Sequence, residues 1–453
     1  MAALSFLDRA RTVAPPSYNR WLIPPAALAV HLSIGQVYAF SVFKTPLVEH
    51  FDTKLTPIGI IFSIAIVMLG LSAAIGGTWV EENGPRKTMF VAALCWSTGF
   101  LVGALGVATG QLWLLYLGYG FLGGIGLGLG YISPVSTLIK WFPDRPGLAT
   151  GLAIMGFGGG ALVASPLSTK LLGLYADGPA NGIVYSFLTL GALYFVVMML
   201  GAFTVRVPAD DWKPAGWSPP VTQAGGLKTT ANVSAANAIK TPQFWALWVV
   251  LFCNVTAGIG ILEQASPMIR DFFAGVSIEE AAGYVGLLSL CNMAGRFVWS
   301  TTSDLIGRKN IYLLYLGLGA LLYLAVASLG TASIGLFLLL TGVILSFYGG
   351  GFATVPAYLK DLFGGYQVGA IHGRLLTAWS AAGVAGPLIV NAIADSQKSA
   401  GKAGSGLYDV SLYIMVGVLV LGFIANLTVR PVDSRFHEPV DTDSERPLAR
   451  MED

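Results

Sequence analysis

The sequence contains twelve apolar runs of about 20 residues, and these runs constrain the fold more than any other feature. Each helical residue adds about 1.5 Å, so about 20 apolar residues cross the hydrocarbon core of a bilayer. The runs lie near 21–43, 57–79, 87–109, 112–138, 147–171, 183–205, 243–265, 280–303, 311–330, 334–358, 369–394 and 409–430. Backbone polar groups find no water inside lipid, so each run is predicted to be helical. The sequence therefore predicts an all-α membrane protein with twelve transmembrane helices.

The composition agrees with lipid as the solvent. Only 11% of the residues are charged and the mean hydropathy is +0.69, whereas a soluble domain carries about 25% charged residues. The formal net charge of +2 offers no basic face for a nucleic acid, so no such partner is expected. The first twenty residues lack the apolar core and cleavage site of a signal peptide, so we expect the first helix to stay uncleaved.

The positions of Lys and Arg predict the orientation of the chain. Nineteen of the 26 basic residues fall in the segments that share a side with the termini, and six fall in the opposite segments. The basic residue that remains, Arg296, lies inside an apolar run. Because cytoplasmic loops carry the excess of Lys and Arg, both termini are predicted to be cytoplasmic.

A polar stretch divides the runs into two groups of six. Residues 206–242 are rich in Pro, Gly, Ala and Thr and show no apolar period, which is typical of a linker. We therefore expect a cytoplasmic segment at 1–20, a six-helix bundle at 21–205, a cytoplasmic linker at 206–242, a second bundle at 243–430 and a cytoplasmic tail at 431–453.

Two loops resemble each other across these halves. "GTWVEENGPRK" spans residues 77–87 and "STTSDLIGRK" spans 300–309, with the acid and the glycine of the two copies both 223 residues apart. Equal offsets indicate a duplicated six-helix unit. We predict that the charged residues of these loops pair across the cytoplasmic side and close it; they are Glu81, Arg86, Asp304 and Arg308. The alternative is that these charges only mark the orientation of the chain.

Two such loops, after the second and the eighth run, resemble the signature loops of the major facilitator superfamily. The first copy departs from the pattern, with Glu81-Glu82 where the family usually has Asp and a basic residue, and with Pro85 after the glycine. Within that superfamily, three stretches resemble the oxalate/formate antiporter family, a relative of the monocarboxylate transporters: "IGQVYAFSVF" (34–43), "GYISPVSTLIKWFPDRPGLATGLAIMGFGGGA" (130–161) and "IHGRLLTAW" (371–379). The resemblance implies two pseudo-symmetric bundles, alternating access and a monomer in a bacterial inner membrane.

Other classes of protein are disfavoured. The glycine-rich runs at 123–130 and 156–161 lack a preceding strand and a phosphate-facing lysine, so we interpret them as positions of close helix packing. The three cysteines lie in apolar runs without metal-ligand spacing, and no cluster has catalytic spacing. We expect neither an enzyme nor a metal or other cofactor.

Arg296 is the residue on which the functional prediction depends. It lies eight residues before Asp304, about 12 Å along a helix, so it is expected near mid-membrane. Its guanidinium keeps its charge, and burial costs at least about 2.5–3.5 kcal/mol. Asn292, one turn earlier, is neutral, so an anion that comes and goes is the expected partner, and a planar guanidinium suits a carboxylate. The alternative is a structural arginine that donates to helix carbonyls.

The resemblance implies the same role, because an arginine of the eighth span binds the substrate carboxylate in these families. Further candidates for the binding pocket come from the central spans: Asn292, Gln36, Tyr38, Tyr131, Tyr348, Phe352 and Trp379. The aromatic candidates could equally be packing residues. Trp379 stands where the oxalate carrier of the family has a lysine, so a single central cation favours a monocarboxylate such as lactate, pyruvate or formate over oxalate.

The coupling ion is left open between antiport with a second carboxylate and proton symport. Proton-coupled relatives pair a lysine of the first span with an acid four residues before the arginine, and these positions read Val42 and Asn292 here. His31 could carry a proton, although a lone histidine in a helix is more often packed and hydrogen-bonded. We therefore predict a secondary carboxylate transporter, with a transporter-like carboxylate sensor as the alternative.

Overall fold

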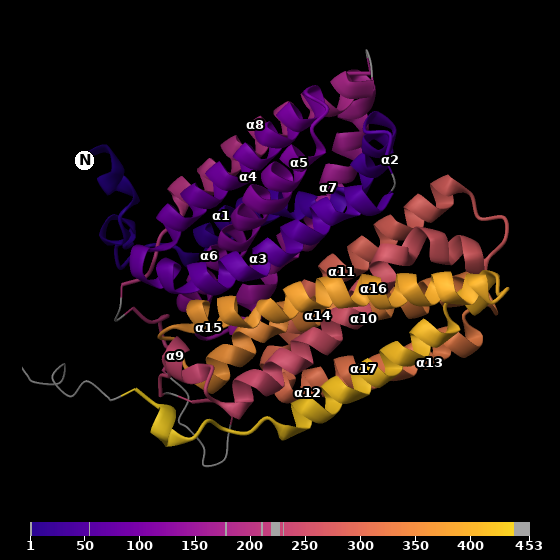
Figure 1. The fold of residues 1–453 in the computed structure, drawn as a ribbon. Helices are drawn as coiled ribbons and strands as arrows, with labels where there is room; N and C mark the ends of the chain where they lie inside the picture. The colour runs from indigo at the N-terminus through magenta and orange to yellow at the C-terminus, as the bar shows by residue number, and fades with distance from the viewer. Residues whose placement is uncertain are drawn as a thin grey trace, which may run out of the picture.

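We describe the protein from a computed structural model, which describes residues 2–53, 55–176, 179–209, 212–218, 227–229 and 231–438. The described residues are almost entirely helical, and their one isolated β-bridge joins Val13 to Val207. The first half of the chain forms α1 (Ile23–Ile34), α2 (Ser41–His50), α3 (Leu55–Asn83), α4 (Pro85–Ala108), α5 (Leu112–Leu115), α6 (Gly123–Trp141), α7 (Pro146–Leu174) and α8 (Pro179–Thr204) (Figure 1).

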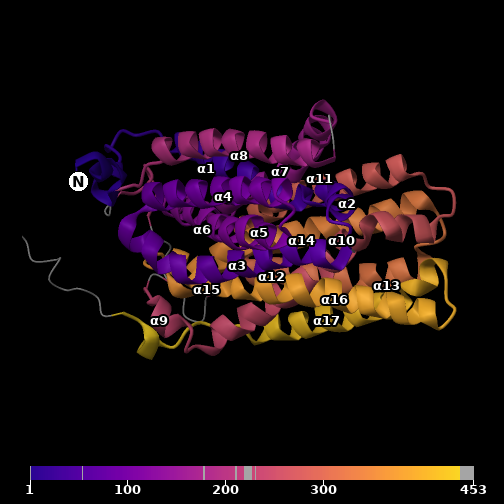
Figure 2. The ribbon, with the colours of Figure 1, turned by 45° about the horizontal axis from the view of Figure 1, so that its top comes forward.

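After the linker, a short helix precedes the helices of the second half. These elements are α9 (Ala235–Ala238), α10 (Pro242–Phe272), α11 (Ile278–Ile306), α12 (Arg308–Leu313), α13 (Gly319–Leu329), α14 (Ile334–Phe363), α15 (Val368–Leu375), α16 (Thr377–Ser399) and α17 (Asp409–Thr428). In Figures 1 and 2 the helices of each half lie together, and the two groups pack side by side. We call them the first bundle (α1–α8) and the second bundle (α10–α17).

The expectation of an all-helical membrane fold is confirmed. In the part of the chain that the structure describes, eleven helical segments are long and apolar enough to cross a membrane, and each overlaps an expected run. The remaining expected run, 280–303, corresponds to α11, which is equally long but richer in polar residues. Several spans are built from two helices, because the 3-10 turn Gly35–Ala39 and the π-helical turns Tyr116–Leu122 and Leu314–Leu318 interrupt them.

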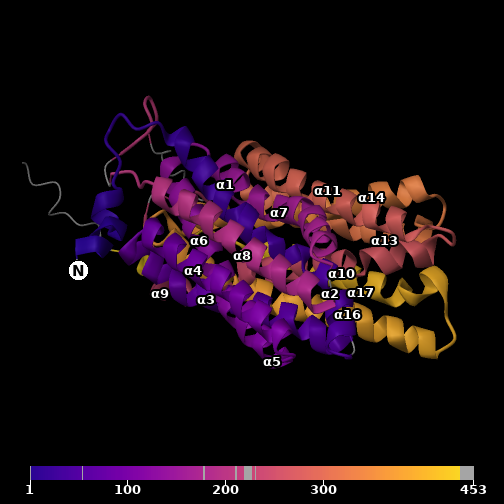
Figure 3. The ribbon, with the colours of Figure 1, turned by 90° about the horizontal axis from the view of Figure 1, so that it is seen from above.

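The N-terminus, α9 and the last described residues lie at one end of both bundles, which we call the termini side (Figures 1 and 3). The opposite end, with the loop between α16 and α17, is the far side. Three helix pairs make the most extensive contacts between the bundles: α7 with α11, and α3 with α15 and with α16. Glycine permits this close approach, because a Cβ on Gly77 would lie 2.8 Å from the Ala370 Cα, and one on Gly151 would lie 2.9 Å from the Arg296 carbonyl oxygen.

Candidate functional site

Arg296 on α11 lies fully buried between the two bundles. Its Nε donates to the Oδ1 of Asn292 over 3.0 Å, one helical turn earlier. Its Nη1 donates to the Ile154 carbonyl oxygen on α7 of the first bundle over 3.3 Å. Within the described residues, its Nη2 has no hydrogen-bond partner and its charge has no carboxylate in an ion pair. The guanidinium is therefore anchored through Nε and Nη1, and Nη2 is its one nitrogen without a hydrogen bond to a described residue.

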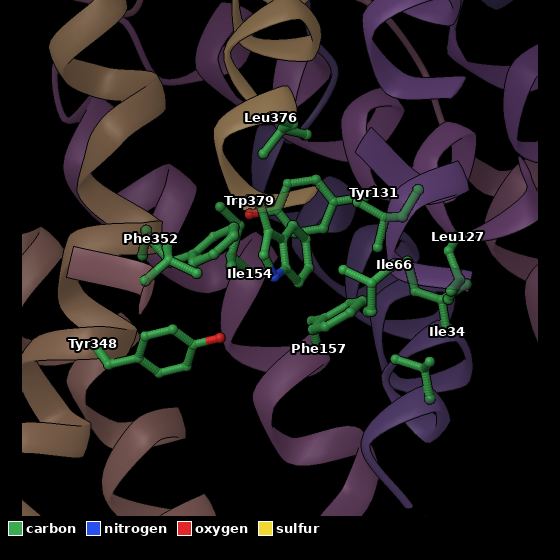
Figure 4. Close-up of a cluster of buried hydrophobic side chains, with 14 of the residues drawn as sticks. Ile34, Ile66, Leu127, Tyr131, Ile154, Phe157, Tyr348, Phe352, Leu376 and Trp379 are labelled. Atoms are coloured by element: carbon green, nitrogen blue, oxygen red, sulfur yellow. The ribbon is translucent and has the colours of Figure 1, made fainter. Parts of the chain in front are cut away.

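Aromatic rings from both bundles surround this guanidinium. The Arg296 Cζ lies 5.6 Å from the ring centre of Phe157 and 5.4 Å from that of Phe352, within cation–π range. Trp379 lies 4.3 Å from Phe352 and 5.4 Å from Phe157, and Tyr131 lies 5.5 Å from Trp379, between ring centres. We call these four rings with Arg296 the central cluster; Figure 4 shows the four rings grouped between helices of the two bundles.

The central cluster contains donors that lack acceptors. Within the described residues, the Tyr131 hydroxyl and the Trp379 indole nitrogen are buried without a hydrogen-bond partner, as is the Nη2 of Arg296. An unsatisfied buried donor costs about 1–3 kcal/mol. Three unsatisfied donors thus belong to this one aromatic cluster.

A tyrosine pair joins the bundles beside this cluster. The Tyr38 hydroxyl on the first bundle lies 3.3 Å from the Tyr348 hydroxyl on the second. The Tyr38 hydroxyl also lies close enough to Arg296 to interact with its side chain, which places the tyrosine pair next to the guanidinium. In Figure 4 the Tyr348 hydroxyl points toward the space beside Phe157 and Trp379. The structure thus brings together seven of the eight predicted pocket residues, whose binding roles stay predictions.

Gln36 lies apart from that group, within the first bundle. Its Oε1 accepts a hydrogen bond from the Tyr119 hydroxyl over 2.8 Å, and no contact between Gln36 and Arg296 is found. His31 also faces the first bundle. Its Nδ1 contacts the Ala153 carbonyl oxygen, and its Nε2 lies 3.1 Å from the Tyr131 carbonyl oxygen. These contacts fit a packed histidine, which was the alternative interpretation.

The two acids of the repeated loops contact backbone amides of the opposite bundle on the termini side. Asp304 accepts from the amides of Gly147 and Leu148, each over 2.9 Å, at the start of α7. Glu81 accepts from the amide of Gly369 over 3.1 Å, at the start of α15. A carboxylate at a helix N-terminus satisfies free N–H groups and complements the helix dipole. Each acid thus caps a helix of the other bundle, an arrangement we call the crossed caps.

The basic residues of these loops are placed differently from the prediction. Arg308 pairs with Asp304 and Asp361 within the second bundle, so it does not cross to the first. Arg86 pairs with no acid among the described residues; it donates to the carbonyl oxygen of Phe6 over 2.9 Å and lies 4.4 Å from that ring's centre. The prediction that Arg86 pairs across to the second bundle is therefore wrong in this conformation, because its side chain points from α4 toward the N-terminal segment.

Several groups in these contacts were not predicted. Ile154 and the amides of Gly147, Leu148 and Gly369 act through the backbone, which residue type does not reveal. Phe157 lies inside a glycine-rich run that we assigned to packing. Lys140, which pairs with Glu81, was counted only as an orientation signal. A search for every polar residue within an apolar run would have found His372, a buried histidine of α15.

Two helical bundles with eleven described segments long and apolar enough to cross a membrane define the class of the protein: a multi-pass membrane protein. The family model described as Major Facilitator Superfamily matches residues 26–387 and 274–450. This chain belongs to the Major Facilitator Superfamily, and the members of this family are transporters rather than enzymes.

The relatives of the chain include carboxylate carriers. It is 26% identical over 388 residues to the "Oxalate:formate antiporter" of Oxalobacter formigenes, covering 83% of this chain and 85% of that protein. It is 27% identical over 357 residues to "Apicoplast pyruvate carrier 1" of Toxoplasma gondii, covering 67% of this chain and 63% of that protein. The crystal structure of the transporter FucP in its outward conformation has a TM-score of 0.66 at 14% identity, covering 90% of this chain and 99% of that one, which confirms the fold.

Proposed function

We propose that this protein moves small carboxylate anions across the membrane by alternating access, with Arg296 as the counter-charge of the substrate. One observation carries the proposal: a fully buried guanidinium between the bundles has a free Nη2 and no carboxylate partner among the described residues. A substrate carboxylate that accepts from Nη2 would supply the missing negative charge. The carboxylates named for the relatives support the same class of substrate.

The central cluster favours a monocarboxylate. Arg296 is the one cation within it, and the surrounding groups are aromatic. A second carboxylate on the same substrate would lie among rings and neutral donors, where an uncompensated charge is costly. Lactate, pyruvate and formate each carry one charge, and the free donors of Tyr131 and Trp379 could bind the keto or hydroxyl oxygen of the first two. Oxalate, with two charges, is expected to bind less well.

The crossed caps support a conformation closed on the termini side. Opening that side requires α7 to leave α11 and α15 to leave α3, which breaks the amide contacts of Asp304 and Glu81. We propose, from the excess of basic residues in those segments, that this side is cytoplasmic and that the conformation faces outward. Substrate would then enter from the far side and leave when the crossed caps part.

Binding is tested by ligand-dependent thermal stabilisation of the purified protein, with pyruvate, lactate, formate and oxalate in turn. We expect pyruvate to stabilise the wild type, Arg296→Lys to weaken this markedly because lysine lacks the planar guanidinium that holds Asn292 and Ile154 while it presents Nη2, and Arg296→Ala to abolish it. Arg435→Ala, at an exposed arginine on the termini side, is the control and should retain the wild-type shift. Pyruvate-induced stabilisation that survives in Arg296→Ala would place the binding site elsewhere.

Transport is tested by counterflow in proteoliposomes. Vesicles loaded with unlabelled pyruvate should accumulate labelled pyruvate through the wild type, and Asp433→Asn, at an exposed acid, should leave this unchanged. Binding without accumulation would support the carboxylate sensor instead.

A further inference from the structure

His372 on α15 is a buried titratable group for which the carboxylate site gives no role. Its side chain is 1% exposed, and within the described residues neither ring nitrogen has a hydrogen-bond partner. Its ring lies 5.9 Å from that of Tyr131, across the boundary between the bundles. Building on the carboxylate transport proposed above, we propose that His372 binds the proton that is taken up with the substrate anion.

The position of His372 allows it to exchange protons as the bundles move. The helix α15 is seated on α3: the Gly369 amide is capped by Glu81, and a Cβ on Gly373 would lie 2.8 Å from the carbonyl carbon of Ala73. These contacts exclude water from the ring in the present conformation. When the termini side opens, α15 must leave α3, and the first residues of α15, His372 among them, meet water on that side.

Charge links a proton on His372 to an anion on Arg296. Tyr131 contacts both His372 and Trp379 of the central cluster, so one aromatic ring connects the two sites. Arg296 is positive and has no carboxylate partner among the described residues, so a protonated His372 would add a second uncompensated charge. A bound monocarboxylate offsets one of the two positive charges and so lowers that penalty. Because coupling is reciprocal, the anion favours the proton and the proton favours the anion by the same factor.

His31 is less suited to this role. Both of its ring nitrogens face carbonyl oxygens, those of Ala153 and Tyr131, and all three residues belong to the first bundle. Separation of the bundles therefore leaves these contacts in place. His372 differs in both respects, with unpartnered nitrogens and a neighbour on the opposite bundle.

The other described titratable groups around α15 form no hydrogen bond with His372. The described side chains on the elements packed against α15 are Glu81 and Glu82 on α3, Tyr131 and Lys140 on α6, Tyr348, Tyr358, Lys360 and Asp361 on α14, Cys253, Arg270 and Asp271 on α10 and Lys398 on α16; α9 contributes none, and α15 itself carries Arg374. Glu81 is engaged by Lys140 and the Gly369 amide, and Asp361 by Arg308. Tyr131 is the member of this set whose ring meets His372.

The test measures proton uptake on binding, independently of transport. Pyruvate is added to purified protein in weakly buffered solution with a pH indicator, and its Kd is measured from pH 5.5 to 8.5. We expect the wild type to take up about one proton per pyruvate, and its Kd to rise by up to about tenfold per pH unit across the coupled range. His372→Gln and His372→Asn should still bind pyruvate, with proton uptake near zero and a Kd that changes less than about twofold. The control His50→Gln, at a partly buried histidine of α2 near the far side, should behave as the wild type.

The outcomes separate this inference from the function on which it rests. Pyruvate binding by the wild type without proton uptake overturns the proton site and leaves carboxylate binding intact. Proton uptake that persists in both His372 variants, or that is lost in His31→Gln instead, also overturns the assignment. Failure of the wild type to bind pyruvate, lactate or formate at any pH would instead remove the proposed function itself.

Discussion

Replacing Asp304 by Asn should shift the protein toward the conformation that is open on the termini side. Asp304 holds the amides of Gly147 and Leu148, each at 2.9 Å, and these contacts join α11 to the start of α7. Asn keeps one acceptor oxygen and no charge, so one amide loses its acceptor and the helix N-terminus loses its negative charge. Arg308 keeps Asp361 as a partner at 3.2 Å, so the substitution leaves no unpaired cation.

The magnitude follows from these two losses. A hydrogen bond to a charged group contributes about 1.5–3 kcal/mol, and a charge at a helix N-terminus about 0.3–1 kcal/mol. The carboxylate is partly exposed, with 16% of the side chain accessible, so the lower values apply and the sum is about 2 kcal/mol. Since 1.4 kcal/mol is a factor of ten, the population open on the termini side should rise by about 30-fold.

Cysteine labelling measures this shift. Ser136 is buried on the termini side, where a Cβ on Gly369 would lie 2.8 Å from its Cβ, so opening should expose it. Ser136→Cys, in a background without the three native cysteines, should react with a maleimide about 30-fold faster when Asp304→Asn is added. Asp433→Asn, which removes an exposed acid on the same side, is the matched control and should leave the rate unchanged. Equal labelling rates in the folded Asp304→Asn and control proteins would mean that the acids of the repeated loops do not hold the termini side closed and only mark the orientation of the chain.

Three further substitutions test other parts of the reasoning. Glu81→Gln should raise the same labelling rate by a smaller factor, because Gln keeps an acceptor for the single Gly369 amide and loses only the charge that pairs with Lys140. An unchanged rate would mean that Asp304 alone of the two acids holds the termini side closed. Trp379→Lys adds a second cation to the central cluster and should move the binding preference from pyruvate toward oxalate in a competition assay. If the variant folds and oxalate still does not compete, the shape of the pocket rather than its charge determines which anion binds. Gly295→Ala places a Cβ 2.6 Å from the Ser346 Cα, so we expect a loss of about 1–3 kcal/mol in thermal stability, whereas Gly286→Ala on the same helix meets nothing within 4 Å and should cost nothing; equal stability of the two would contradict the packing argument.

The sequence predicted the helices well because lipid leaves a chain few choices. Apolar runs long enough to span must be helical, and the runs overlapped the observed helices throughout the described residues. Breaks within spans, such as the turn at Gly35–Ala39, were not predicted, because local hydrogen bonding rather than hydropathy determines them. The sequence also predicted that Arg296 is buried without a neighbouring acid, since a charged residue inside an apolar run can be recognised from the sequence alone.

Contacts between the bundles were harder to predict. Their partners are backbone amides, such as those of Gly147 and Gly369, and residue type carries no information about which amide faces which acid. The same limit explains Gln36, whose place in the first span suggested the pocket but whose side chain turns to Tyr119. Position along a helix gives depth, whereas the direction of a side chain depends on how the helix is rotated in the bundle.

The two repeated loops share the same backbone turn, although their acids pair with different basic residues. Gly84 and Gly307 both adopt positive φ, 84° and 87°, a conformation that glycine adopts without strain, and each follows its acid by three residues. This shared turn ends one helix, begins the next and leaves the acid facing the opposite bundle.

The counter-charges of the two acids then come from different places. In the second copy, Arg308 directly follows the glycine and pairs with Asp304 one turn earlier. The equivalent position of the first copy is Pro85, which cannot pair, and Lys140 of α6 supplies the positive charge for Glu81 instead. The proline that departs from the family pattern therefore predicts a specific dependence: Lys140→Ala should weaken the crossed cap of Glu81 and accelerate labelling at Ser136→Cys. Labelling that stays at the control rate would mean that the amide of Gly369 holds Glu81 without help from a cation.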